Sequence, residues 1–518
     1  MEKEATYRFV GEPPHGWFLG MTVAQLTAMA AAGALVVVLV NTIGAVALLA
    51  VFPIGALTLF VAFWKRAGLT LLEWTPVTVA YAVGRVAGQQ EYRAPAAGHL
   101  IPLPSGPELD EVKPEPPTAL PAELAEIAIL EATLPRFGGV RMGVAYDRRA
   151  LTYTAVIRCE PRGFYLMSPS EREYQLACYG GLLAMFAREF SPVRRIAWYE
   201  RSLPPSSNEL VEHLHAARRP GIPDADPGMR AMWELLEAHG TGTVDHEVLV
   251  ALQIDLKRTS ARAAASKLGQ DKAGACALLA EHTSLLVDQL AAMGVMAGQQ
   301  AGVRSPAVPS PEMLAKLLRD GIDPFSRRSR DVAPNGQDPG ISVEDFGPRA
   351  RTDGWGHVRT DGALHAVVRV SRWPARDVRS SFLQPLLMDT HEVTRTCAMV
   401  MEVLPPEKAR RHVERRALSA EGDRAVRARF GKRESARTRL ATEAIAQHEL
   451  ELAVGHADVS FAAYVDVSVA EHRGIAALER DFSVVQSSAL GAGLQLDRCW
   501  GTQAQALTFT LPLARGLA

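Results

Sequence analysis

Metal-dependent hydrolysis is the first chemistry that residue types in this chain could support, through histidine–glutamate pairs at His246-Glu247, His391-Glu392 and His448-Glu449. A zinc hydrolase uses the pattern H-E-x-x-H, so that two imidazoles share one helix face and bind the metal. None of the three pairs is followed by the second histidine. The sequence therefore predicts no zinc-hydrolase site.

Phosphate chemistry is the second candidate. A nucleotide-binding loop has the pattern G-x-x-x-x-G-K-[ST], in which backbone amides, lysine and hydroxyl meet phosphates and magnesium. The nearest segment, Phe430-Gly431-Lys432-Arg433, lacks the first glycine and the hydroxyl. Leu285-Leu286-Val287-Asp288 has the apolar-then-acidic pattern of a magnesium-binding strand, but without the loop it predicts an ordinary amphipathic helix.

The sequence also lacks a recognisable motif for nucleophilic catalysis. There is no G-x-S-x-G elbow. The cysteines are odd in number, far apart and never in a C-x-x-C pair, which predicts free thiols in a reducing compartment; they are Cys159, Cys178, Cys276, Cys397 and Cys499. We therefore predict that the protein is not an enzyme, with no catalytic, cofactor-binding or metal-binding residue and no cofactor.

A local excess of positive charge lies between Pro405 and Leu440. This segment has twelve lysines and arginines against five acidic residues, whereas the whole chain has a net charge of −1. One interpretation is a solvated helix face, partly neutralised by Glu414 and Glu434. The other is a docking surface for anionic lipid, nucleic acid or an acidic partner such as a motor subunit. Partner docking is favoured within that group, because the segment lacks the interleaved aromatic residues that bind single strands.

The elements that must position these residues begin with an apolar N-terminal region. From Val23 to Trp64 there is no charged side chain, and a bilayer core about 30 Å thick is crossed by roughly 20 helical residues. Asn41, Thr42 and Gly44 interrupt the run halfway. The sequence therefore predicts a transmembrane helical hairpin.

Two other interpretations of the apolar region are less favourable. A secretory signal peptide has a basic start and a shorter apolar core, unlike Glu2, Lys3 and Glu4 here. A hairpin buried in a soluble core rarely lacks every charge over this length.

The flanking charges predict the orientation of the hairpin. Lys3 and Arg8 precede the first span, and Lys65 and Arg66 follow the second, whereas the connection carries no basic residue. Both termini are therefore predicted to be cytoplasmic, in a two-span protein of the inner (cytoplasmic) membrane. Thr70 and Glu73 then form a predicted capping box for a helix lying on the membrane surface, on a partner or on the chain's own domain.

The remaining chain divides into regions of different composition. We predict four parts: 1–92, the hairpin with its interfacial helix; 93–131, a proline-rich acidic linker; 132–340, a first cytoplasmic α+β domain; and 341–518, a second one. The overall fold class is a membrane-anchored α+β protein with ferredoxin-like α/β sandwich domains, their helices on one face of a largely antiparallel sheet.

Hydrophobic periodicity predicts the elements of the two domains. In the first they are strands 140–146 and 151–159, helix 170–190, strands 193–199 and 243–256, and helices 272–293 and 311–318. In the second they are strand 363–370, helix 375–388, strand 398–404, long helices over 406–452, strand 459–467, helix 470–490, and closing strands 494–499 and 504–513.

The first 95 residues resemble the PrgI family, the two-helix inner-membrane component of type IV secretion and conjugation systems. The resemblance rests on Tyr7-Arg8-Phe9, on residues 21–26 (MTVAQL) entering the first span, and on residues 68–74 (GLTLLEW) after the second. It implies a membrane subunit of such an apparatus.

From about Leu134 the chain resembles the N-terminal, non-catalytic part of the type IV secretion ATPase. This resemblance rests on residues 365–374, on residues 382–387 (FLQPLL), on the long basic helices and on residues 506–513 (ALTFTLPL). In the ATPases the last of these leads into the motor, which we expect to be absent from this chain.

Together these resemblances imply a scaffold subunit of a type IV secretion-like (conjugation) apparatus that docks a separate ATPase. The implied partners are that ATPase, other membrane subunits, the bilayer and further copies of the chain, without direct binding of nucleic acid. A type VII secretion membrane component and a membrane-tethered enzyme with an unrecognised site are the alternatives.

Overall fold

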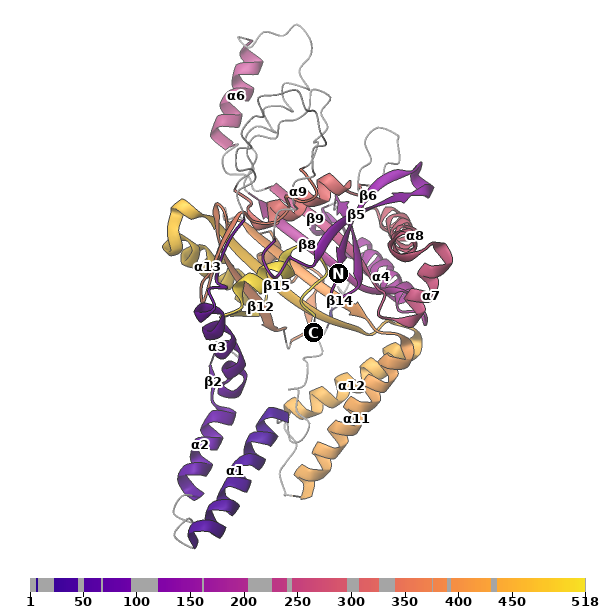
Figure 1. Cartoon of the computed structure of the whole chain (residues 1–518). Helices are drawn as coiled ribbons and strands as arrows, with labels where there is room; N and C mark the ends of the chain where they lie inside the picture. The colour runs from indigo at the N-terminus through magenta and orange to yellow at the C-terminus, as the bar shows by residue number, and fades with distance from the viewer. Residues whose placement is uncertain are drawn as a thin grey trace.

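The protein is a mixture of helix and sheet (Figure 1). The computed structural model describes residues 6–7, 23–44, 51–66, 69–94, 120–160, 163–203, 226–239, 245–295, 307–325, 341–374, 376–388, 393–429 and 436–517. Most of the predicted linker therefore lies outside the described residues, as do His391, Glu392 and the segment 430–433.

Within the described ranges, twelve strands form a single sheet, and every pairing in it is antiparallel. This bears out the predicted α+β class, and the sheet continues without interruption from one predicted domain into the other. In spatial order the strands are β4 (Glu91–Arg93), β10 (Ala350–Asp353), β11 (Val358–Arg359), β12 (Ala363–Arg372), β15 (Val459–Ala470), β14 (Arg395–Val403), β8 (Val193–Leu203), β9 (Asp245–Asp255), β7 (Thr152–Cys159), β6 (Val140–Asp147) and β5 (Ile127–Leu134), with β16 (Gln495–Arg498) beside β12.

Both faces of the sheet are covered, so the prediction of helices on one face is wrong. One face packs against α4 (Pro169–Phe186), α8 (Asp271–Ala292) and α13 (Gly474–Gly491), and the other against α9 (Pro311–Ile322) and α14 (Gln503–Thr510). The reason is visible in the strands, where successive side chains point to opposite faces. Continuous apolar runs such as that of β9 therefore place apolar side chains on both faces.

The sheet contains two units with the same connectivity. The first runs β7, α4, β8, β9, α8, and the second runs β12, the short helix α10 (Gln384–Leu387), β14, β15, α13. In each unit the third strand lies between the other two. The second strands, β8 and β14, pair with each other and join the units, with Tyr199 opposite Ala398.

Two predicted elements of the second unit are wrong. The closing strand 504–513 is instead α14, followed by an irregular segment with bends at 511–513. Its first residue, Gln503, bonds through its side-chain amide to Val367 N at 2.8 Å and Val367 O at 3.1 Å, which satisfies β12 without an added strand. The predicted helix 375–388 is β13 (Val378–Arg379) followed by the single-turn α10.

Two helical hairpins extend from the sheet toward the same end of the molecule (Figure 1). The N-terminal one consists of α1 (Val23–Ile43) and α2 (Val51–Phe63), and the other, inserted between β14 and β15, consists of α11 (Pro406–Arg429) and α12 (Ala436–Val454). The opposite end carries α6 (Pro227–His239) (Figure 1). The remaining short elements are α7 (Thr259–Leu268), η2 (Pro135–Phe137), η3 (Phe164–Leu166) and η4 (Glu471–Arg473).

Candidate functional site

Among the described residues, α1 is the one helix long and apolar enough to cross a membrane. Its 21 residues correspond to about 32 Å, close to the thickness of a bilayer core. The 13 residues of α2 are too few to span that core as a straight helix. Large apolar side chains on both helices, including Leu35, Val37, Phe52 and Leu57, are exposed, which a bilayer favours and water does not. The hairpin is therefore a candidate membrane anchor.

The two helices of the anchor run antiparallel. Gln25 near the start of α1 donates from Nε2 to the carbonyl oxygen of Ala62 near the end of α2, at 2.7 Å. Both residues are buried between the helices. A polar group within the apolar pair is thus satisfied inside it, as a hydrocarbon environment requires.

The segments on both sides of the hairpin pair with the rest of the chain. Before α1, β1 (Thr6–Tyr7) pairs with β13 (Val378–Arg379). After α2 come the paired strands β2 (Lys65–Arg66) and β3 (Leu69–Thr70), then α3 (Leu71–Val86), and then β4, which pairs with β10 as part of the sheet. Both ends of the anchor are therefore tied to the same body.

Helix α3 begins with the predicted capping box and contacts the loop between β10 and β11 of the chain's own body. Thr70 N donates to Glu73 Oε2 at 2.8 Å, and Glu73 N donates to Thr70 Oγ1 at 3.4 Å. The ring of Trp74 stacks on Trp355 at 5.8 Å, and Tyr81 meets the same indole edge-on at 4.9 Å. Of the three predicted environments for this helix, the structure has contact with the protein's own domain.

A buried polar cluster holds the strand pairing between β4 and β10. Arg351 is buried, forms an ion pair with Glu123 and donates to the carbonyl oxygen of Gln89 at 3.2 Å. Asp353 accepts from Ala504 N at 3.3 Å, at the first turn of α14. Burial raises the pKa of Asp353 to about 6. The segment between α3 and β4, the sheet edge and α14 thus meet at one junction.

The nearest approach to a catalytic constellation lies where β8 and β9 pair. Ser202 Oγ donates to Glu200 Oε1 at 2.9 Å, and His246 Nδ1 lies 2.7 Å from the same oxygen and 3.3 Å from Ser202 Oγ. In a hydrolase triad the hydroxyl and the carboxylate meet opposite nitrogens of the imidazole. Here both meet Nδ1, and Ser202 is buried. This geometry satisfies buried polar groups and presents no nucleophile.

The other residues considered for chemistry have structural partners. Glu247 pairs with Arg158 at 2.6 Å and Arg201 at 3.4 Å. Asp288 lies within the helix α8, as predicted, and pairs with Arg136 at 3.6 Å. In the part of the chain that the structure describes, no group of histidine, cysteine and carboxylate side chains is arranged to hold a metal ion.

All five cysteines are free, as predicted. Burial raises the pKa of Cys159 to about 12, that of Cys276 to about 11 and that of Cys397 to about 12. These thiols stay protonated at neutral pH and are poor nucleophiles.

The predicted basic segment forms α11 and the start of α12. The base of this hairpin is fixed by Asp458, whose carboxylate lies 3.3 Å from His412 Nδ1 and 3.3 Å from His448 Nε2. The hydrogen bond that His448 donates to the Asp458 carboxylate raises the pKa of this histidine. Burial alone would raise the pKa of Asp458, but its bonds to the two imidazoles lower it overall.

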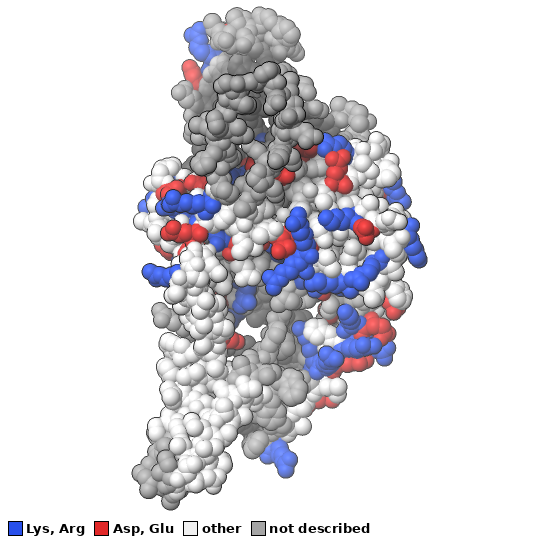
Figure 2. All heavy atoms as spheres, viewed as in Figure 1, with Lys and Arg blue, Asp and Glu red and all other residues white. Residues whose placement is uncertain are grey.

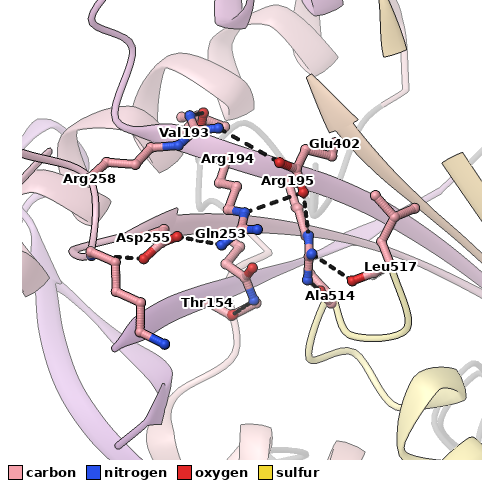
Figure 3. A network of polar contacts seen from close by, with 11 residues as sticks. Thr154, Val193, Arg194, Arg195, Gln253, Asp255, Arg258, Glu402, Ala514 and Leu517 are labelled. Carbon is pink, nitrogen blue, oxygen red and sulfur yellow. Dashed lines mark hydrogen bonds and ion pairs between the residues drawn. The ribbon is translucent and has the colours of Figure 1, made fainter. Parts of the chain in front are cut away.

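Next to this base, an arginine-rich network anchors the C-terminal segment (Figure 3). Arg194 forms ion pairs with Asp255 and with Glu402, the second at 3.2 Å. Glu402 lies four residues before the start of α11. Arg195 pairs with Glu402 at 3.2 Å and donates to the carbonyl oxygen of Leu517 at 2.7 Å. The irregular segment after α14 is therefore pinned across the sheet.

Several of these residues were not singled out by the sequence. Trp355 lies between two glycines in a loop. The position of a single aromatic residue in such a loop is the one feature of the sequence that indicates a packing role for it. Asp458 and Glu402 belong to no motif, because each is paired with residues on other elements of the fold, such as His412 and Arg194. Neither a family model nor a curated protein matches this chain.

Proposed function

We propose that this protein is a membrane-anchored scaffold subunit of a type IV secretion-like apparatus, which holds a separate ATPase at the cytoplasmic face. The observation that carries the proposal is the attachment of both ends of the apolar hairpin to one folded body. The end before α1 is attached through the two-stranded sheet of β1 with β13, and the end after α2 through β4 with β10 in the twelve-stranded sheet. Such a double attachment suits a subunit that keeps a cytoplasmic body in a fixed position at the bilayer.

The same attachment supports a two-span topology with both termini in the cytoplasm. Since β1 and β4 pair with the same body, the residues before α1 and after α2 belong on one side of the membrane. Lys65 and Arg66 after α2 favour the cytoplasmic side. In this proposal the second crossing is the apolar stretch 45–64 of the sequence, which contains α2.

Strand order supports ferredoxin-like units. In the second unit the order β16, β12, β15, β14 corresponds to the fourth, first, third and second strands of a β-α-β-β-α-β fold. The first unit has the same order for its three shared strands, with β6 in the place of the fourth. We infer that the body is a pair of such units joined through β8 and β14.

We propose that the motor is a separate protein. The 518 residues contain no G-x-x-x-x-G-K-[ST] loop, the loop with which such a motor binds nucleotide phosphates. The run 506–513, which in the resembling ATPases leads toward the motor, here packs on the sheet, with Leu511 and Leu513 buried.

The test is affinity purification of the tagged full chain from gently solubilised membranes, with mass spectrometry of the proteins that accompany it. Recovery of a secretion-type ATPase supports the proposal, and a preparation without one contradicts it. Truncation at residue 340 would cut through the sheet, so a better companion variant replaces residues 405–457 by Asn-Gly. Leu404 N bonds to Asp458 O at 3.0 Å, so a two-residue turn can close this ladder. ATPase recovery with that variant assigns docking to the sheet body.

A further inference from the structure

The α11–α12 hairpin carries a surface whose charge the proposed function does not use. Arg410 and Arg411 keep 76% and 68% of their side-chain surface exposed. Arg415, Arg424 and Arg429 are exposed further along α11. Over residues 405–440 basic residues outnumber acidic ones by seven. Over the whole hairpin, residues 406–454, twelve basic residues stand against eight acidic ones, so the excess positive charge lies on α11 and the start of α12.

This hairpin contributes little to the core of the protein. Ala409 and Val413 near its base are buried, but Leu418, one turn further, is 68% exposed. The strands on either side pair directly, with Val403 opposite Val459. The sheet would therefore be complete without the insertion, so folding alone gives no reason for its charge.

The direction of the hairpin identifies the surface that it can meet. Figure 1 shows α11 and α12 slanting toward the same end of the molecule as α1 and α2. In Figure 2 the anchor arm is white, whereas lysine and arginine side chains gather where α11 lies. A bilayer around the anchor therefore lies next to the basic hairpin.

We propose that the α11–α12 hairpin binds the anionic headgroups of the bilayer in which the chain is anchored. Each lysine or arginine near an anionic cytoplasmic leaflet is attracted to it, and the attraction falls off within a Debye length. Beyond its base α11 has few large apolar residues, so its basic face lies on the headgroups and does not enter the hydrocarbon. Contact through both hairpins fixes the tilt of the sheet relative to the membrane. This inference rests on the membrane anchor and not on the secretion function.

The test uses the full-length protein in nanodiscs and measures amide hydrogen exchange of residues 406–454. One set of discs contains phosphatidylcholine only, and the other contains about 30 mol % phosphatidylglycerol. We expect exchange in α11 to slow several-fold in the anionic discs. Raising NaCl to about 0.5 M should abolish that difference, because salt screens the attraction.

Two double variants with the same change in charge provide the control. Arg415→Glu with Arg429→Glu should remove the lipid dependence. Arg136→Glu with Arg230→Glu should retain it, because the η2 turn and α6 lie away from α11; Figure 1 shows α6 at the opposite end of the molecule.

Equal exchange of the wild type in both kinds of disc overturns the inference. Slowing in phosphatidylcholine discs on addition of duplex DNA, without any effect of anionic lipid, overturns it in favour of nucleic acid. A chain that does not enter nanodiscs overturns both the anchor and this contact. Failure to recover an ATPase, in contrast, bears on the proposed function alone.

Discussion

Ring contacts of one indole hold α3 against the loop between β10 and β11, so Trp355→Ala should weaken the junction between the anchor and the sheet. Trp355 forms ring contacts with Trp74 and with Tyr81, at 5.8 and 4.9 Å. An aromatic pair contributes about 0.5–1.5 kcal/mol beyond its buried area, so two pairs give about 1–3 kcal/mol. That free energy corresponds to about a five- to 150-fold change in the equilibrium constant for separation of α3 from the loop that carries Trp355.

The assay is amide hydrogen exchange of the full chain in detergent micelles. Exchange of residues 71–93, which contain α3 and β4, should accelerate by that factor, while β9 and β15 keep their protection. Trp373→Ala is the matched control, because Trp373 makes one edge-on contact, with Phe461 at 5.1 Å, elsewhere in the sheet. Unchanged exchange of residues 71–93 in a folded Trp355→Ala protein, or an equal effect of Trp373→Ala, would refute the reasoning.

Three further perturbations test other parts of the structure. Tyr199→Phe leaves the amide of Ala514 without its 2.9 Å acceptor. The free energy of opening of residues 511–517, obtained from amide hydrogen exchange, should therefore fall by about 1–3 kcal/mol. An unchanged value would contradict the pinning of this segment. Gly143→Ala places a Cβ 2.9 Å from atoms of α9. We expect the free energy of unfolding to fall by about 1–3 kcal/mol, measured as a lower midpoint of urea denaturation. An unchanged midpoint would show that α9 can move. Because the pKa of His448 is raised in the fold, its bond to Asp458 stabilises the hairpin base below the ordinary histidine pKa and weakens as pH rises through the shifted value. Exchange at the base, corrected for intrinsic rates, should therefore increase between about pH 6 and 8, and Asp458→Asn should remove that dependence.

Elements with strong local periodicity were predictable from the sequence. Strands 140–146 and 151–159 and the helix 272–293 differ from β6, β7 and α8 by one residue at most at each end. Their apolar patterns are set by neighbours within the same element, so local reasoning is sufficient. The capping box at Thr70 and Glu73 was predictable for the same reason.

Features that depend on distant partners were not predictable. The pairing of β8 with β14 joins residues about two hundred positions apart, and no local pattern reports it. The strand predicted over residues 504–513 failed because the side chain of Gln503, and not a backbone strand, satisfies Val367. The junction at Trp355 needed both the loop and α3 to be placed first.

His365, the first residue of one segment that carries the resemblance, has a structural explanation. Its Nδ1 lies 2.8 Å from Asp466 Oδ2, and its Nε2 lies 2.9 Å from the carbonyl oxygen of Ile322. Both partners accept hydrogen bonds, so an imidazolium that donates from both nitrogens fits the site. Burial lowers the pKa of His365, but Asp466 raises it overall.

That contact extends the path from the membrane into the whole sheet. Ile322 ends α9, which packs on the strands of the first unit, whereas His365 and Asp466 pair β12 with β15 in the second. The anchor reaches the second unit through β4 and β10, and β11 then connects β10 to β12. A displacement of the N-terminal hairpin would therefore be transmitted to both units, which is the mechanical property that the proposed scaffold function requires.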